Sequence, residues 1–298
     1  MRWINHAAFA ALLAASLLSL ALSPSSLTTV EVGGEFQLPV PSSRLAVSAF
    51  SALLSLALLV EGLPRYRRSA FIARVEGQVP EMVKSFQSAF STGLTMADAA
   101  RMVAESGLSP INGIFRQALA NYRLTGDLPA SLFRAVAGSG SRKAVSALKV
   151  IMAAYQHGAG AEEALEALYR SLSQLREFES QKRSHLGQYT AIIYVMVPIF
   201  SLVASIVVVG FIPQLQSLKA SSSPFAEGIG GGGGIGISVP TGLSIIQLTS
   251  SVISLFAGAI IGRLVYGDPW AGLIHSSALV AISLAVYLAA PLASGMFT

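Results

Sequence analysis

Histidines, neighbouring glutamates and a glycine run are the features of this sequence that could support catalysis or ligand binding. The histidines are His6, His157, His185 and His275. Their separations match no metal-ligand spacing, and His157, which we place in a helix turn, suits a solvated or turn-capping role better than a catalytic one. The chain has no cysteine, which excludes disulfides, thiolate metal sites and a cysteine nucleophile.

The glutamates and the glycine run also have plainer explanations than an active site. Glu162, Glu163 and Glu166 open a predicted helix, where negative charge interacts favourably with the helix dipole. The run Gly230 to Gly234 lacks the following Gly-Lys-Ser/Thr of a phosphate-binding loop, so we interpret it as a flexible linker. We therefore predict that the chain is not an enzyme and holds no metal or cofactor.

The composition is typical of a polytopic membrane protein. Of the 298 residues, 53% are hydrophobic and 12% are charged, whereas soluble domains carry about 25% charged residues. Five apolar segments are long enough to cross a bilayer. The predicted spans are Ile4 to Leu22, Leu45 to Leu63, Gln188 to Ile212, Gly242 to Ile261 and Ala271 to Leu292. The first span resembles a signal peptide, but Pro24 makes a poor cleavage site and favours an uncleaved span.

The segments beside the spans are predicted from proline, glycine and polar residues. Residues 24–43 are predicted to be a short polar loop, and residues 213–241 a Ser- and Gly-rich loop. Pro64 is predicted to close the second span, and Pro198 to kink the third.

Charge places the central segment, residues 61–187, in the cytoplasm. It holds 16 of the 20 Lys and Arg residues and 11 of the 15 Asp and Glu residues. Near the span ends, eight basic residues lie on the side of this segment and two, Arg44 and Lys219, on the other, which is the bias expected of cytoplasmic segments. The net charge of +5 is therefore attributed to topology rather than nucleic-acid binding. The cluster Arg65, Arg67 and Arg68 is assigned to anionic lipid headgroups, with an acidic partner as the alternative.

Residues 64–187 are predicted to form six amphipathic helices. The first carries one apolar stripe, Val79, Met82, Val83, Phe86 and Phe90. Thr95 to Asp98 fits a capping box for the second helix. Ser109 and Pro110 are predicted to start the third, and Asp127 to cap the fourth. The sixth helix could continue into the third span.

Glycines mark the predicted turns between these helices. Gly93, Gly126 and Gly160 each precede an alanine by four residues, and they recur at intervals of 33 and 34 residues. The pattern predicts three helical hairpins. A tetratricopeptide array has a similar period, but its Trp, Gly and Tyr positions are missing. A compact six-helix bundle is therefore preferred.

This arrangement resembles the type II secretion system F family, the membrane platform proteins of type II secretion, type IV pili, Tad pili and archaella. The residues similar to the family's motifs are Val79 to Met82, Phe90 to Ala99, Gly126 to Leu132, and Gly160 to Leu165 with the helix that follows to Arg176. The resemblance covers roughly residues 75–212. The bacterial secretion and type IV pilus members carry two such cytoplasmic domains. One domain after two spans is more similar to the Tad-type or archaeal arrangement.

The resemblance implies an all-α, polytopic platform protein of the plasma membrane that couples a cytoplasmic hexameric secretion ATPase to pilin-like subunits of a filament or pseudopilus. Membrane lipids and a homo- or hetero-oligomer with a paralogue are further expected partners, and nucleic acid is not. The expected domains are residues 1–63 with two spans, 64–187 as the cytoplasmic bundle, and 188–298 with three spans. The candidate ATPase-docking residues are Arg101, Arg116, Arg123, Arg134, Arg142 and Lys143.

A permease or channel subunit for a neutral solute is the alternative function. The kinked third span and the glycine-rich loop motivate it. Transporters usually place ionisable groups within their spans, and the cores of the five predicted spans contain no Asp, Glu, Lys or Arg, which weighs against transport. Gly258 and Gly262 are spaced for close helix packing within the fourth span.

Overall fold

The computed structural model describes residues 2–21, 27–32, 36–41, 43–158, 160–220 and 238–294. The chain divides into two compact units, Met1–Tyr66 with Leu186–Thr298, and Arg67–His185. We call the first the membrane unit and the second the helical unit. Two long helices, α2 (Arg44–Ser91) and α7 (Ala161–Ala220), contribute residues to both units. The predicted all-α class is confirmed, as is the continuation of the sixth predicted helix into the third span.

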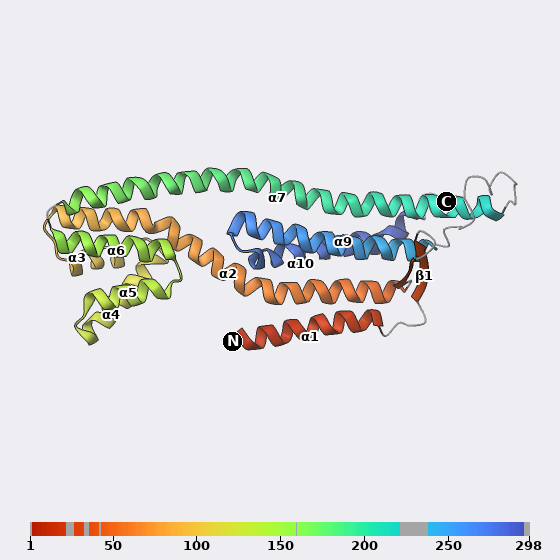
Figure 1. Cartoon of the computed structure of the whole chain (residues 1–298), viewed down its shortest axis with the longest axis horizontal. Helices are drawn as coiled ribbons and strands as arrows, with labels where there is room; N and C mark the ends of the chain where they lie inside the picture. The colour runs from red at the N-terminus through yellow and green to blue at the C-terminus, as the bar shows by residue number, and fades with distance from the viewer. Residues whose placement is uncertain are drawn as a thin grey trace. The chain divides into compact units, whose positions relative to one another are not determined.

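The helical unit contains the C-terminal part of α2, four shorter helices and the N-terminal part of α7. The shorter helices are α3 (Met96–Glu105), α4 (Ile111–Thr125), α5 (Leu128–Gly138) and α6 (Arg142–His157). Along the chain, α3 packs against α4, α4 against α5, and α5 against α6 (Figure 1). Residues from all six helices form one hydrophobic core.

The apolar stripe predicted on α2 forms the centre of this core. Val79, Met82, Val83 and Phe86 are at most 1% exposed, and burying each such side chain contributes about 1.5–3 kcal/mol. The ring centroids of Phe86 and Phe115 of α4 lie 5.9 Å apart. Helix α2 is therefore the element on which the neighbouring helices pack.

Side chains cap the short helices, mostly as the sequence predicts. Thr95 accepts a hydrogen bond from the Asp98 amide over 3.2 Å, and Asp127 accepts one from the Ala130 amide over 3.0 Å. The predicted cap at the start of α4 is wrong, because Pro110 occupies the N-cap position without a side-chain cap bond.

A distant residue supplies the cap of α4 instead. The Gln78 amide oxygen accepts a hydrogen bond from the Ile111 amide over 3.2 Å, and the Gln78 amide group donates to the Ser109 carbonyl over 2.6 Å. The amide of Ile111, one of the orphan backbone groups at this helix start, is thus satisfied by α2.

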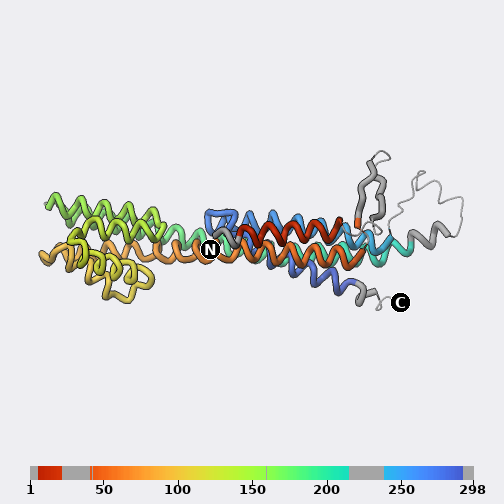
Figure 2. The backbone as a smooth tube through the Cα atoms, turned by 90° about the horizontal axis from the view of Figure 1, so that it is seen from below, coloured from red at the N-terminus to blue at the C-terminus, as the bar shows by residue number. Residues whose placement is uncertain are grey.

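The membrane unit contains the described helices that are long and apolar enough to cross a bilayer. These are parts of α2 and α7, α9 (Val239–Ile261) with the π-helical η2 (Gly262–Tyr266), and the 3-10 helix η3 (Pro269–Gly272) with α10 (Leu273–Ser294). The first predicted span corresponds to α1 (Arg2–Ala21), whose apolar part is shorter. Helix α1 runs alongside the first part of α2 (Figure 2). Four described helices therefore match predicted spans in length and composition, and the chain is a multi-pass membrane protein.

The helix that contains the second predicted span continues beyond Pro64, because α2 runs to Ser91. The Glu61–Arg65 ion pair spans the turn at Pro64, and prolines are tolerated inside membrane helices. One local prediction in the membrane unit is wrong, that of a loop without regular structure over residues 24–43. The predicted polar loop contains an antiparallel hairpin of β1 (Leu27–Val32) and β2 (Phe36–Pro41), with Leu27 opposite Pro41. The Thr- and Val-rich sequence of β1 favours a strand.

Small residues set the packing of α9 against η3 and α10. A Cβ added to Gly258 would lie 2.2 Å from the Ser276 backbone nitrogen, and one added to Gly262 would lie 2.4 Å from the Gly272 nitrogen. Both contacts are shorter than any real side chain tolerates, so only glycine allows this approach. The predicted packing role of Gly258 and Gly262 is confirmed.

Candidate functional site

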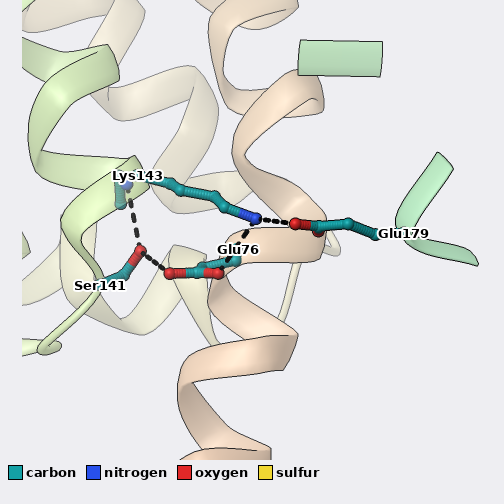
Figure 3. Close-up of polar contacts among 5 residues, drawn as sticks. Glu76, Ser141, Lys143 and Glu179 are labelled. Atoms are coloured by element: carbon teal, nitrogen blue, oxygen red, sulfur yellow. Dashed lines mark hydrogen bonds and ion pairs between the residues drawn. The ribbon is translucent and has the colours of Figure 1, made fainter. Parts of the chain in front are cut away.

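A polar cluster in the helical unit joins three helices at one point (Figure 3). The Glu76 carboxylate of α2 accepts a hydrogen bond from the Ser141 hydroxyl over 3.2 Å and lies 3.4 Å from the Lys143 ammonium. Lys143 also donates to the Glu179 carboxylate of α7. Ser141 in turn caps α6 by accepting from the Ala144 amide over 3.1 Å. The cluster therefore connects the start of α6 to both long helices.

Lys143 carries its positive charge firmly in this cluster. Partial burial disfavours the charged ammonium, but the hydrogen bond to Glu179 and the attraction of Glu76 outweigh burial, so the pKa of Lys143 is raised above its ordinary value. Two carboxylates thus neutralise one ammonium. A group held in this way supports the fold and is not a free docking charge.

The six basic residues predicted to dock an ATPase occupy different environments. Arg101, Arg116, Arg123, Arg134 and Arg142 are exposed, whereas Lys143 is half-buried. Arg101 lies 3.5 Å from Asp98 on α3, and the Arg116 guanidinium donates to the Ala104 carbonyl over 2.9 Å. No ion pair among the described residues engages Arg123, Arg134 or Arg142. These three remain available to a partner.

The structure adds two residues that the sequence interpretation did not select. The Lys149 ammonium of α6 lies 5.8 Å from the ring centroid of Phe133 on α5, within the range of a cation–π contact. Phe133 is 39% exposed and Lys149 is exposed. The seven-residue spacing of Arg142 and Lys149 places both on one face of a helix. This spacing is the sequence signal that could have identified Lys149.

The glycines predicted at the hairpin turns all have positive backbone φ angles. The values are 73° for Gly93, 72° for Gly126 and 80° for Gly160, and no atom lies within 4 Å of a Cβ added to any of them. Backbone conformation rather than space therefore requires glycine at these positions. Gly126 is the C-cap of α4, and its amide donates to the Tyr122 carbonyl over 2.8 Å.

A buried carboxylate lies near the end of the second predicted span. Glu61 is 3% exposed. Its Oε1 accepts from Arg65 Nε over 2.8 Å and lies 2.6 Å from a terminal nitrogen of the same guanidinium. Its Oε2 lies 3.1 Å from His6 Nδ1. The predicted absence of charge applies to the span cores, and Glu61 is an ionisable exception close to the span end.

Aromatic residues surround the same end of the membrane unit. The Arg65 guanidinium lies 4.9 Å from the ring centroid of Trp270. Tyr66 and Tyr266 have ring centroids 5.4 Å apart in an edge-to-face arrangement, and Tyr266 stacks on His275 at 5.9 Å. Tyrosine and tryptophan are enriched where a membrane protein meets the water interface.

The residues that could have served catalysis remain apart. Within the described residues, no three His, Cys, Asp or Glu side chains group as metal ligands would. His6 contacts Glu61, whereas the His275 Nδ1 lies 2.8 Å from the Tyr194 hydroxyl. Glu166 pairs with Arg170 on the exposed face of α7. The features that the structure offers for function are therefore a helical unit with exposed basic residues and a membrane anchor.

Comparison with known protein families identifies the helical unit. Residues 82–209 match the family model of the type II secretion system (T2SS), protein F, which confirms the predicted family over this segment. The match begins in α2, includes α3 to α6, and ends in the membrane-spanning part of α7. No curated protein and no solved structure gives a significant match.

Proposed function

We propose that this chain is the membrane platform of a filament-assembling or pseudopilus-assembling secretion machine. In this role the helical unit binds a cytoplasmic secretion ATPase, and the membrane unit holds pilin-like subunits during assembly. The platform itself performs no chemistry. The division into residues 1–63, 64–187 and 188–298 is part of the same proposal, as are association with lipids and with a second copy or a paralogue.

One observation carries the proposal. The match to the T2SS protein F family begins within the core-forming part of α2, where Met82 and Phe86 are fully buried, and continues through the helical unit into the third span. The matched region is thus the folded core of the helical unit together with its connection to a membrane helix. This is the part that a platform needs in order to join a soluble motor to the bilayer.

The proposed orientation, with the helical unit in the cytoplasm, is supported by charge. Eight basic residues near the span ends lie on the side of the helical unit, against two on the other side. Arg65 lies with Tyr66, Tyr266 and Trp270 at one end of the membrane unit; the aromatic residues are typical of a membrane–water interface, and the basic residue favours the cytoplasmic one. The helical unit is therefore proposed to be cytoplasmic.

Gene deletion combined with protein capture tests the proposal. We expect a strain that lacks this gene and any paralogue to lose its surface filaments or secreted substrate, and a plasmid copy to restore them. The affinity-tagged full chain, solubilised from membranes in mild detergent, should capture a hexameric secretion ATPase. An unrelated multi-pass protein carrying the same tag is the control. Normal filaments and normal secretion in the deletion strain would refute the platform role.

A permease or channel subunit is the second candidate, because Glu61 and the buried Gln247 place polar groups inside the membrane unit. Glu61 is paired with Arg65 within its own helix, and the Gln247 amide donates to Ser51 over 3.1 Å and to Ser283 over 3.4 Å. The Gln247 bonds join α9 to α2 and α10, and interhelical bonds of this kind hold spans together. Solute uptake by proteoliposomes that contain only this chain would favour the permease.

A further inference from the structure

The net positive charge of the helical unit is concentrated on three consecutive helices. Residues 106–160, which include α4, α5 and α6, carry six basic residues and one acidic residue. The basic residues are Arg116, Arg123, Arg134, Arg142, Lys143 and Lys149. The acidic residue, Asp127, caps α5. This part of the unit therefore contains almost no negative charge of its own.

Lys143 is the member of this set that other helices neutralise. It pairs with Glu76 of α2 and Glu179 of α7. Among the described residues, no ion pair engages Arg134, Arg142 or Lys149. These three exposed groups are therefore open to a carboxylate of another molecule.

Arg142 occupies a position that the helix itself disfavours. It is the first residue of α6, and the first turn of this helix contains no acidic residue. The positive end of the helix dipole repels a cation there. The exposed Arg142 guanidinium thus adds charge at an unfavourable site, and the fold gains no ion pair from it.

Exposed apolar side chains lie on the same two helices as the exposed charges of α5 and α6. Phe133 is 39% exposed and Val150 is 40% exposed, and Lys149 lies over the Phe133 ring at 5.8 Å. Arg134 neighbours Phe133 in sequence, and Arg142 lies two helical turns before Lys149. We call these five residues, Phe133, Arg134, Arg142, Lys149 and Val150, the basic–aromatic patch.

We propose that the basic–aromatic patch binds an acidic protein surface that carries an apolar pocket for Phe133. The inference rests on the proposed function, in which this surface belongs to the secretion ATPase. Exposed aromatic and arginine side chains are the residue types that dominate protein–protein binding energy. The unpaired cations favour an acidic partner, and the exposed Phe133 ring and Val150 side chain add apolar contact area to them. Of the six residues in the predicted docking set, the patch keeps Arg134 and Arg142, and it adds Phe133, Lys149 and Val150.

Binding of the full chain to its ATPase tests the patch directly. The chain is reconstituted in nanodiscs of zwitterionic lipid, and its affinity for the purified ATPase is measured by biolayer interferometry. We expect Lys149→Glu and Phe133→Ala each to weaken binding about ten-fold or more. Raising the salt concentration should weaken wild-type binding more steeply than that of Lys149→Glu, because exposed charges are screened.

Matched variants separate the patch from general changes in charge or apolar area. Arg170→Glu makes the same change in charge on α7, and Leu124→Ala removes an 86% exposed side chain from α4. Both should bind the ATPase within about two-fold of wild type. Arg134→Glu, at an exposed position of α5, provides a second patch variant. Circular dichroism of each variant confirms that the helices remain folded.

Each outcome decides between the two proposals. Equal loss of affinity in patch and control variants overturns the patch but leaves the platform role standing. Failure of the wild-type nanodisc to bind the ATPase overturns both. Co-flotation with phosphatidylglycerol vesicles that the patch variants abolish, together with unchanged ATPase binding, would assign the patch to lipid and overturn the inference.

Discussion

Replacing Lys143 by methionine should loosen the attachment of α6 to α2 and α7. Methionine keeps most of the apolar stem of lysine but removes the ammonium that lies 3.4 Å from Glu76 and pairs with Glu179. Both carboxylates would then face each other without an intervening cation. The Ser141 hydroxyl would remain bonded to Glu76 over 3.2 Å, so the cap of α6 should survive the substitution.

The solvent exposure of the three paired side chains determines how much stability the Lys143→Met substitution should remove. The Lys143, Glu76 and Glu179 side chains are 30%, 23% and 49% exposed. Exposed pairs contribute about 0.2–1 kcal/mol, whereas breaking a fully buried pair costs about 3–5 kcal/mol. Removing a cation from the N-terminus of α6 offsets about 0.3–0.5 kcal/mol of the loss. We expect a net destabilisation of about 1 kcal/mol, or about 3–6 °C in the melting temperature of the helical unit.

Thermal unfolding of the full chain in detergent measures this effect, with Lys149→Met as the matched control. Lys149 lies on the same helix but has no acidic partner among the described residues, so its substitution should shift the melting temperature by less than about 2 °C. Hydrogen exchange measured by mass spectrometry should show faster exchange in the first turns of α6 for Lys143→Met only.

The stability difference between wild type and Lys143→Met should depend on pH with a definite sign. The pKa of Lys143 is raised above its ordinary value of 10.5 in the folded chain. The stabilisation is therefore fully present below pH 10.5 and is lost as the pH rises through the folded-state pKa. The stability gap between wild type and Lys143→Met should stay constant near neutral pH and narrow above pH 10.5. An equal melting temperature at pH 7, or a gap that widens in alkali, would refute this reasoning.

Three further predictions concern helix packing and capping. Gly258→Leu should destabilise the membrane unit by more than about 2 kcal/mol because its Cβ would lie 2.2 Å from α10 atoms. Thermal aggregation in detergent measures this loss of stability. The control, Gly210→Ala, has open space around it and should have little effect. Gln78→Ala should cost about 0.5–2 kcal/mol by uncapping α4, seen as faster hydrogen exchange at its first turn, and unchanged exchange there would count against the tertiary cap. The hydrogen bond from Thr95 holds the pKa of the Asp98 carboxyl below 3.8. Thr95→Ala should therefore raise that pKa in an NMR titration. In the wild type, the cap should weaken as the pH falls through the folded-state pKa of Asp98. An unchanged Asp98 titration would contradict this assignment.

Local sequence patterns predicted the helices of the helical unit because their signals lie within a few residues. The stripe Val79, Met82 and Phe86 repeats at helical spacing and is fully buried, and Asp127 caps the helix that it precedes. Where the stabilising partner is distant, the patterns failed. The Gln78 side chain caps a helix that starts 33 residues later, and α2 continues through Pro64 although proline removes a backbone hydrogen bond.

The candidate docking residues illustrate the same limit. Charge alone selected Arg134, Arg142 and Lys143 as equals, because each is a basic residue of the predicted helical bundle. Lys143 differs from the two arginines because it pairs with Glu76 and Glu179. Both acids lie on other helices and far from Lys143 in the sequence, so no local sequence pattern indicates the pairing. The family resemblance was recognisable because it depends on the order and spacing of several short motifs, whereas the choice of docking residues depends on pairwise contacts.

Lys143 and Lys149 show how one helix divides its charges between fold and function. They are six residues apart, which rotates them by about 120° around α6. Lys143 consequently reaches Glu76 and Glu179, whereas Lys149 reaches the exposed ring of Phe133. An ion pair that includes two acids holds α6 against the long helices, and the cation on the other face has an aromatic neighbour and no counterion among the described residues. A docking surface needs a helix that is firmly attached to the rest of the fold and a cation that can bind a partner. A partner can exert force on the long helices only through a helix that is itself attached to them.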